Sequence, residues 1–92
     1  MKESSKFELQ ADVRFRVVAD EGIIIRQTEG EVLSVNQLGG EILTLIQKNQ
    51  SFGDIVAALT RQYNAESKII FKDAQAYLEE LLSSQVINIV EE

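Results

Sequence analysis

The first third of the chain alternates between apolar and polar residues, which is the pattern of a half-buried strand. Charged or amide side chains separate the apolar positions, which are Phe7, Leu9, Ala11, Val13, Phe15 and Val17. This alternation predicts a strand from Val13 to Ala19. Because chain ends fray, residues 1–12 are predicted to form an N-terminal extension or a partial strand.

Two turn signals divide the residues that follow into two further strands. Asp20-Glu21-Gly22 predicts a turn in which Gly22 takes a positive φ, and Thr28-Glu29-Gly30 predicts another. The β-branched run from Ile23 to Ile25 suits a second strand, and Glu31 to Val35 suits a third. Together the three strands predict an antiparallel meander.

After Asn36 the apolar residues recur at helical spacing. Asn36 is placed to cap the first turn of this helix, which ends at Lys48-Asn49-Gln50. Gly39 and Gly40 each weaken a helix by about 1 kcal/mol relative to alanine. Either another group packs closely against these glycines, or the helix starts later.

Two more helices and a strand are expected after residue 50. Ser51-x-x-Asp54 resembles a capping box, and the third helix is predicted from Ser67–Ile69 to Ser83. The predicted buried stripes are Phe52, Ile55, Val56, Leu59 and Tyr63, then Phe71, Ala74, Leu78, Leu81 and Leu82, with Ile70 and Tyr77 beside them. Val86 to Val90 predicts a short strand returning to the sheet. The order predicts an α+β, winged-helix-like fold, with residues 13–90 as a single domain.

Composition excludes most catalytic chemistry. The 92 residues include no cysteine, histidine, proline or tryptophan. The chain therefore has no thiol nucleophile, no histidine base and none of the usual zinc ligands apart from carboxylates. Asp73 and Glu80 lie about two turns apart on one helix, but no surrounding motif supports an acid–base pair. We expect a protein that is not an enzyme and holds no metal or cofactor.

The charge balance bears on the class of partner. Fifteen acidic residues against nine basic ones give a net charge of −6, which disfavours binding to nucleic acid phosphates. The chain shows neither a secretory signal at its start nor an apolar run of the roughly 20 residues that span a bilayer. A cytoplasmic protein with no membrane or nucleic acid partner is expected.

The predicted third strand is a candidate binding element. Glu31 to Asn36 is short and lacks proline, so its free edge could accept an added strand. If the third helix lies across from it, an extended peptide could occupy the groove between strand and helix. Alternatively, a chain terminus or the partner in a homodimer covers this edge.

Four groups of residues follow one another along the chain at set intervals. They are Leu33-Ser-Val-Asn36, Ile42-Leu43, Ser51-x-x-Asp54-Ile55-Val56-x-x-Leu59-x-x-x-Tyr63, and Asp73-x-x-x-Tyr77-Leu78-x-x-Leu81. Their order and spacing resemble those of the PqqD-like proteins. The resemblance covers residues 13 to 90. In two turns the family often has glycine, in an Asp-Gly pair after the first helix and again after the third helix. This chain has Lys48-Asn49-Gln50 and Gln85 there.

The resemblance implies a leader-recognition element of pathways that modify ribosomally made peptides, including coenzyme PQQ synthesis. Such a domain binds the precursor's leader segment by β-strand addition and presents it to an enzyme, such as a radical SAM protein or a peptidase or cyclase. The implied peptide-binding residues are Glu31, Val32, Leu33, Ser34 and Val35 on the strand and Asp73, Tyr77 and Glu80 on the helix, with Lys72, Ala76 and Ser83 as alternates. The rival interpretations are an acidic adaptor for a folded protein and a winged-helix DNA-binding domain.

Overall fold

Strands and helices follow the predicted order along the chain. The computed structural model describes residues 1–91. The elements are β1 (Lys6–Leu9), β2 (Val13–Val18), β3 (Glu21–Arg26), β4 (Glu31–Val35), α1 (Gln37–Gln47), α2 (Phe52–Tyr63), α3 (Ser67–Ser83) and β5 (Ile87–Glu91). The predicted α+β class is therefore confirmed, with an antiparallel meander, three helices and a C-terminal strand.

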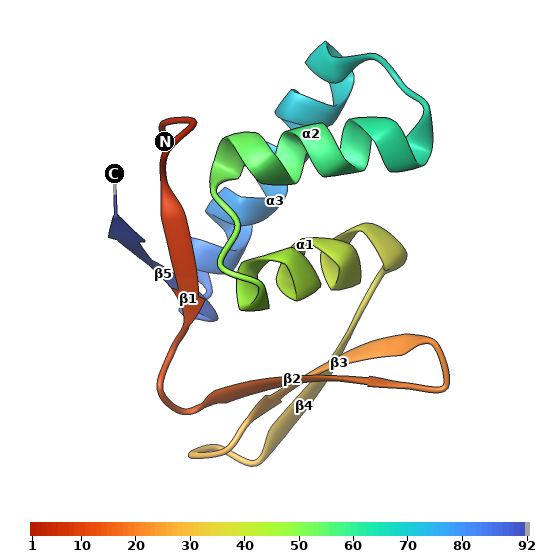
Figure 1. Cartoon of the computed structure of the whole chain (residues 1–92). Helices are drawn as coiled ribbons and strands as arrows, with labels where there is room; N and C mark the ends of the chain where they lie inside the picture. Colours follow the sequence, from red (N-terminus) through yellow and green to blue (C-terminus); the bar gives the residue numbers. More distant parts are fainter. Residues whose placement is uncertain (92) are drawn as a thin grey trace.

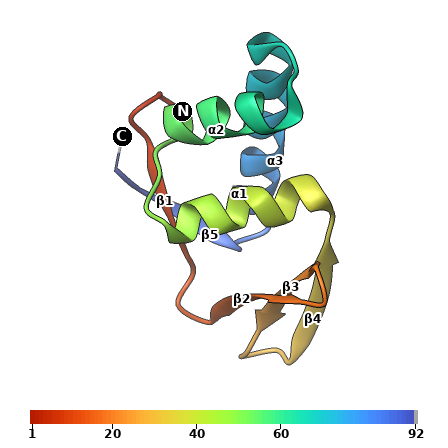
Figure 2. The same cartoon turned by 45° about the vertical axis from the view of Figure 1, so that its right-hand side comes forward.

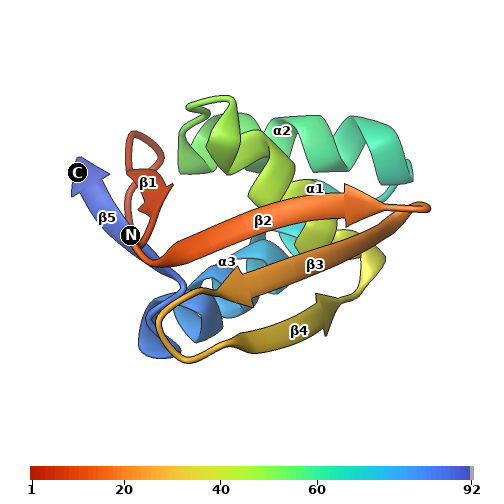
Figure 3. The same cartoon turned by 90° about the horizontal axis from the view of Figure 1, so that it is seen from below.

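The meander forms a three-stranded sheet in the order β2-β3-β4. Its inner face presents Val13, Phe15 and Ile24 to the helices, and each of these side chains is buried. The helices all lie on that side of the sheet (Figure 1). Viewed from below, β2, β3 and β4 are in front and no element covers their outer face (Figure 3).

The β2–β3 turn differs from the prediction. The left-handed residues are Ala19 (φ 52°) and Asp20 (φ 67°), whereas Gly22 lies within β3. Positive φ at both central residues is the geometry of a type I′ hairpin turn, which is closed here by the pair Val18 and Glu21, before the glycine. Gly22 instead allows close packing, because a Cβ there would lie 2.7 Å from Cγ2 of Val35.

Side-chain caps start the first two helices as predicted. Oδ1 of Asn36 accepts a 2.8 Å hydrogen bond from the amide of Gly39. The Ser51 hydroxyl accepts from the Asp54 amide at 3.2 Å, and the Ser51 amide donates to the Asp54 carboxylate at 3.3 Å. These bonds satisfy amide groups that have no partner within the helix. The predicted extent of the third helix is also confirmed.

Three apolar residues predicted to be buried are exposed. The exposed fraction is 59% for Val17, 37% for Tyr63 and 42% for Phe71. Val17 is the next-to-last residue of β2, Tyr63 is the last residue of α2, and Phe71 lies in the second turn of α3. Phe71 still contacts the core, since its ring meets that of Phe52 edge-on with centroids 5.0 Å apart.

The C-terminal strand forms as predicted but pairs elsewhere. β5 does not return to the meander and instead pairs antiparallel with β1 in a separate two-stranded sheet. The end of α3 brings the chain beside the N-terminal segment, where the Gln10 amide donates to the Val86 carbonyl at 2.9 Å. Phe7 and Ile87 are buried between this small sheet and the helices. Figure 2 shows the two strands side by side, away from the meander.

The helices of the described residues, 1–91, include none with the length and apolar character needed to cross a membrane.

Candidate functional site

A groove lies between the free edge of β4 and α3. Its volume is about 190 Å³. Apolar side chains form most of its lining, and polar groups of Ser34, Tyr77, Glu80 and Ser84 complete it. The lining residues are Ile24, Leu33, Ser34, Val35, Tyr77, Glu80, Leu81, Ser84 and Val86. A hollow of this size and character is suited to a large apolar side chain with polar neighbours.

The structure brings together half of the residues that the resemblance implied. Leu33, Ser34, Val35, Tyr77 and Glu80 line the groove. The others are exposed outside this lining, and they are Glu31, Val32, Lys72, Asp73 and Ala76. The alternate Ser83 is likewise exposed and outside it.

Four lining residues were not predicted as site residues. They are Ile24, Leu81, Ser84 and Val86. Leu81 and Ser84 lie four and seven residues after Tyr77, so helical spacing could have identified them. Ile24 and Val86 enter the groove through tertiary packing, for which a single sequence carries no local signal.

The hydrogen-bonding phase of the meander follows from its first turn. A two-residue hairpin is closed by a hydrogen-bonded pair, here Val18 and Glu21. In the same phase, the amide of Gln27 donates to the carbonyl of Asp12 at 2.8 Å. Because such pairs alternate along antiparallel strands, the even-numbered residues of β3 direct their backbone groups to β4.

This phase decides which backbone groups of β4 are free. Ile24 is paired with Leu33 and Arg26 with Glu31, so odd-numbered β4 residues face β3. Val32 and Ser34 therefore direct their amide and carbonyl groups to the open edge. Both residues are exposed. Each offers one donor and one acceptor to an added strand.

Arg26 ties the sheet to the C-terminal end of α3. Its guanidinium donates to the carbonyls of Ser84 at 3.0 Å and Gln85 at 3.2 Å, and Nε pairs with Glu31 at 3.2 Å. The Arg26 side chain is 12% exposed. A cation at a helix C-terminus is favourable because it meets the negative end of the helix dipole. Arg26 thereby holds β4 and α3 at a set separation.

Tyr77 fixes α3 against α1. The tyrosine ring and hydroxyl lie where a Cβ on Gly39 would be, so Gly39 is the residue that allows this contact. The prediction that another group packs closely at this glycine is confirmed. Because Arg26 and Tyr77 both hold α3 in place, the groove is preformed, which reduces the ordering cost of binding.

Both tyrosines hold their protons more tightly than a free side chain. Burial raises the pKa of Tyr77, and the negative charge of Glu80 adds to the effect. Burial and the neighbouring Glu41 carboxylate raise the pKa of Tyr63 from 10.0 to about 12. An anionic phenolate is disfavoured in both places because each site is partly desolvated and negatively charged.

We therefore expect two late tyrosine titrations, with the one for Tyr63 centred near pH 12. The folded state holds the Tyr63 proton more tightly than the unfolded state. Its contribution to stability is thus present below pH 10 and is lost as the pH rises towards 12. Tyrosinate absorbance measures this directly, because the chain has two tyrosines and no tryptophan. Glu41→Gln should lower the pKa of Tyr63 alone, and a common midpoint at pH 10 in the native protein would contradict the assignment.

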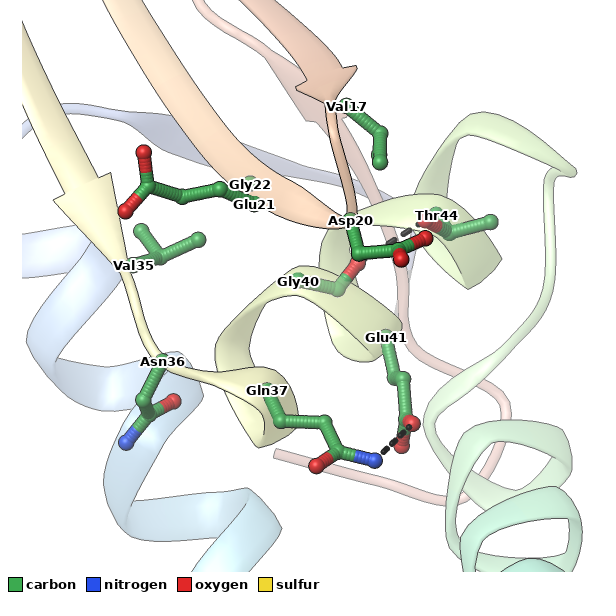
Figure 4. Close-up of a pocket in the computed structure, with 10 residues that line it drawn as sticks. All are labelled: Val17, Asp20, Glu21, Gly22, Val35, Asn36, Gln37, Gly40, Glu41 and Thr44. Atoms are coloured by element: carbon green, nitrogen blue, oxygen red, sulfur yellow. Dashed lines mark hydrogen bonds between the residues drawn. The ribbon is translucent and has the colours of Figure 1, made fainter.

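A larger cavity lies at the other end of the meander. It measures about 630 Å³ and is bordered by the β2–β3 turn, the end of β4 and the start of α1 (Figure 4). Its lining includes Asp20, Glu21 and Glu41. Glu41 accepts hydrogen bonds from Gln37 and Gln62 at 3.2 and 2.7 Å. Among residues 1–91, no three acidic side chains are arranged to hold a metal ion.

Comparison with known proteins identifies the family. The family model described as coenzyme PQQ synthesis protein D (PqqD) matches residues 20–87, which is more than half of the chain. The chain belongs to the PqqD family. No curated protein sequence matches this PqqD-family chain.

Two solved structures share the fold of this PqqD-family chain. One is described as TbiB1 in complex with the TbiA(beta) leader peptide. It has a TM-score of 0.83 and 16% identity, and the match covers 92% of this chain and 99% of that one. The other is a lasso peptide synthetase B1 complexed with the leader peptide. It has a TM-score of 0.81 and 18% identity, and the match covers 90% and 98%.

Two turns of this chain keep a left-handed backbone without glycine. Asn49 has φ 61° and Gln85 has φ 60°, at the two turns where PqqD-like proteins often have glycine. After Gln85, the Val86 amide donates to the Leu81 carbonyl at 3.0 Å. This bond satisfies a carbonyl at the end of α3, so the turn keeps the geometry that glycine would favour.

Proposed function

We propose that this protein is a non-catalytic module that binds the leader segment of a ribosomally made precursor peptide. The leader pairs with the open edge of β4 as a fourth strand of the meander. Val32 and Ser34 supply the backbone hydrogen bonds. The observation that carries the proposal is the juxtaposition of this unpaired edge with the groove on α3. The two solved relatives described as complexes with leader peptides support it.

Side chains of the leader alternate between the two faces of the new strand. Those on the inner face enter the groove, where Leu33 and Leu81 favour an apolar residue and Glu80 favours a cation. Glu31, Lys72, Asp73 and Ala76 lie outside the lining, and we assign them to longer leader side chains at the rim. Residues 13–90 form the recognition unit in this proposal.

The bound leader is then presented, in the cytoplasm, to a modifying enzyme. A radical SAM protein, a peptidase or a cyclase fits this role. The module contributes affinity and local concentration, because tethering the leader makes the encounter between core peptide and enzyme effectively intramolecular. Any cofactor of the reaction belongs to the enzyme.

The proposal is tested by calorimetric titration of the protein with the leader peptide of a precursor whose gene neighbours the gene of this protein. We expect one leader per chain. For a leader that carries a basic residue at the groove, Glu80→Gln should lower the binding affinity several-fold, by about 1 kcal/mol. Glu79→Gln is a matched control, because Glu79 is exposed on the same helix but does not line the groove. Absence of binding, or equal effects of the two substitutions, would contradict the proposal.

A further inference from the structure

The three-stranded sheet has a second edge, formed by β2. In the phase established above, Val13, Phe15 and Val17 direct their backbone groups away from β3. Val17 and Val18, at the end of the strand, are 59% and 56% exposed. A strand edge with exposed apolar side chains is a template for pairing with another chain. The β2 edge could therefore pair with another copy of the chain unless its backbone groups are protected.

Two arginines occupy the carbonyl groups of this edge. Nη1 of Arg16 donates to the carbonyl of Phe15 at 3.0 Å. Nη1 of Arg14 donates to the carbonyls of Val13 and Ala11, each at 3.0 Å. Each guanidinium thus folds back over its own strand and takes up acceptors that an added strand would need.

The rest of the edge is also partly used. The Val13 amide already donates to the Gln10 carbonyl at 3.0 Å. Two β2 edges approaching each other would also bring the guanidinium groups of both copies together, which adds like-charge repulsion. Pairing at β2 therefore requires both the loss of the arginine hydrogen bonds and the approach of like charges.

In the described part of the chain, the β4 strand has neither basic side chains nor side-chain hydrogen bonds to its carbonyl groups. Its sequence, Glu31–Val35, has no lysine, arginine or proline. Among residues 1–91, no side chain is hydrogen-bonded to a β4 carbonyl in the way that Arg14 and Arg16 are bonded on β2. One edge of the same sheet is covered by cations, and the other is left open.

We propose that Arg14 and Arg16 close the β2 edge to strand pairing, so that the sheet accepts an added strand at β4 and does not associate with other copies through β2. This role goes beyond the proposed function, because it holds whichever molecule pairs with β4. The two arginines act as specificity-determining residues for the sheet.

The double variant Arg14→Thr/Arg16→Thr tests this role in the full chain. Threonine has high strand propensity and cannot reach the carbonyls, so the edge should open without loss of the fold. In sedimentation equilibrium, the weight-average mass should rise with concentration from the chain mass of 10.3 kDa towards that of a dimer. Amide exchange at Phe15 and Val17 should slow by about tenfold in concentrated samples. The native protein should show neither change.

Lys48→Thr/Arg61→Thr is the matched control, since it removes the same charge from two exposed sites outside the sheet, one just after α1 and one in α2. The proposal is overturned if the arginine variant behaves like the native protein, if the control associates equally, or if association leaves the Phe15 and Val17 amides unprotected. The single variants Arg14→Thr and Arg16→Thr repeat the test if the double variant does not fold. Each should give a smaller mass increase of the same kind.

Discussion

Replacing Ser34 with proline is expected to weaken leader binding by about ten- to a hundredfold while leaving the fold intact. The Ser34 amide faces the open edge of β4, so proline removes a donor that the protein itself does not use. A carbonyl of the bound leader would then lose its partner and meet the proline ring. Proline is tolerated on an edge strand whose amide faces solvent. Calorimetry measures the affinity, and thermal unfolding checks the fold.

Two neighbouring substitutions make this result specific. Ser34→Thr keeps the amide and should bind nearly as the native protein does. Leu33→Pro removes an amide that faces β3, so it should destabilise the meander itself. Unchanged affinity in a folded Ser34→Pro variant would rule out strand addition at β4.

The effect of Gly39→Ala on stability should depend on Tyr77. In the native background, the added Cβ meets the tyrosine ring and hydroxyl. Overpacking of this kind costs about 1–3 kcal/mol, which exceeds the gain of about 1 kcal/mol from replacing glycine in a helix. We therefore expect a lower free energy of unfolding. In a Tyr77→Ala background only the helix gain remains, so the same substitution should stabilise the protein.

Urea unfolding of the four proteins in this cycle measures the coupling between the two positions. If Gly39→Ala lowers the free energy of unfolding in the native background and raises it in the Tyr77→Ala background, Tyr77 holds α3 against α1 through Gly39. The same sign and size in both backgrounds would mean that the two residues do not interact. Gly40→Ala is a suitable comparison, because the nearest atom to its Cβ is 3.9 Å away, an ordinary packing distance.

Local signals explain why the order of elements could be predicted. Asn36 and Ser51 carry side-chain caps that act within three residues, and alternation in β2 requires only that one face be buried. The strand partner of β5 could not be predicted in this way. That pairing joins residues at opposite ends of the chain, and it depends on where α3 ends in space.

The site shows the same division between local and tertiary information. Tyr77 and Glu80 were predicted because they belong to the implied set on the third helix, where spacings of four and three residues place them on one face with Asp73. The turn before β3 was predicted at Asp20-Glu21-Gly22 with the positive φ at Gly22, but the left-handed residues are Ala19 and Asp20. The position of this turn sets the register of the meander. That register determines which β4 amides are free, so Val32 and Ser34 could be distinguished from Leu33 only in the structure.

The most direct test of leader binding at β4 is an amide NMR titration of the labelled protein with the neighbouring leader peptide. Shifts should concentrate at Val32 and Ser34 on the strand and at Tyr77 and Glu80 on the helix. The amides of Phe15 and Val17 on the β2 edge should stay unchanged. Saturable binding whose shifts fall on other elements, with none at Val32 and Ser34, would contradict strand addition in this groove.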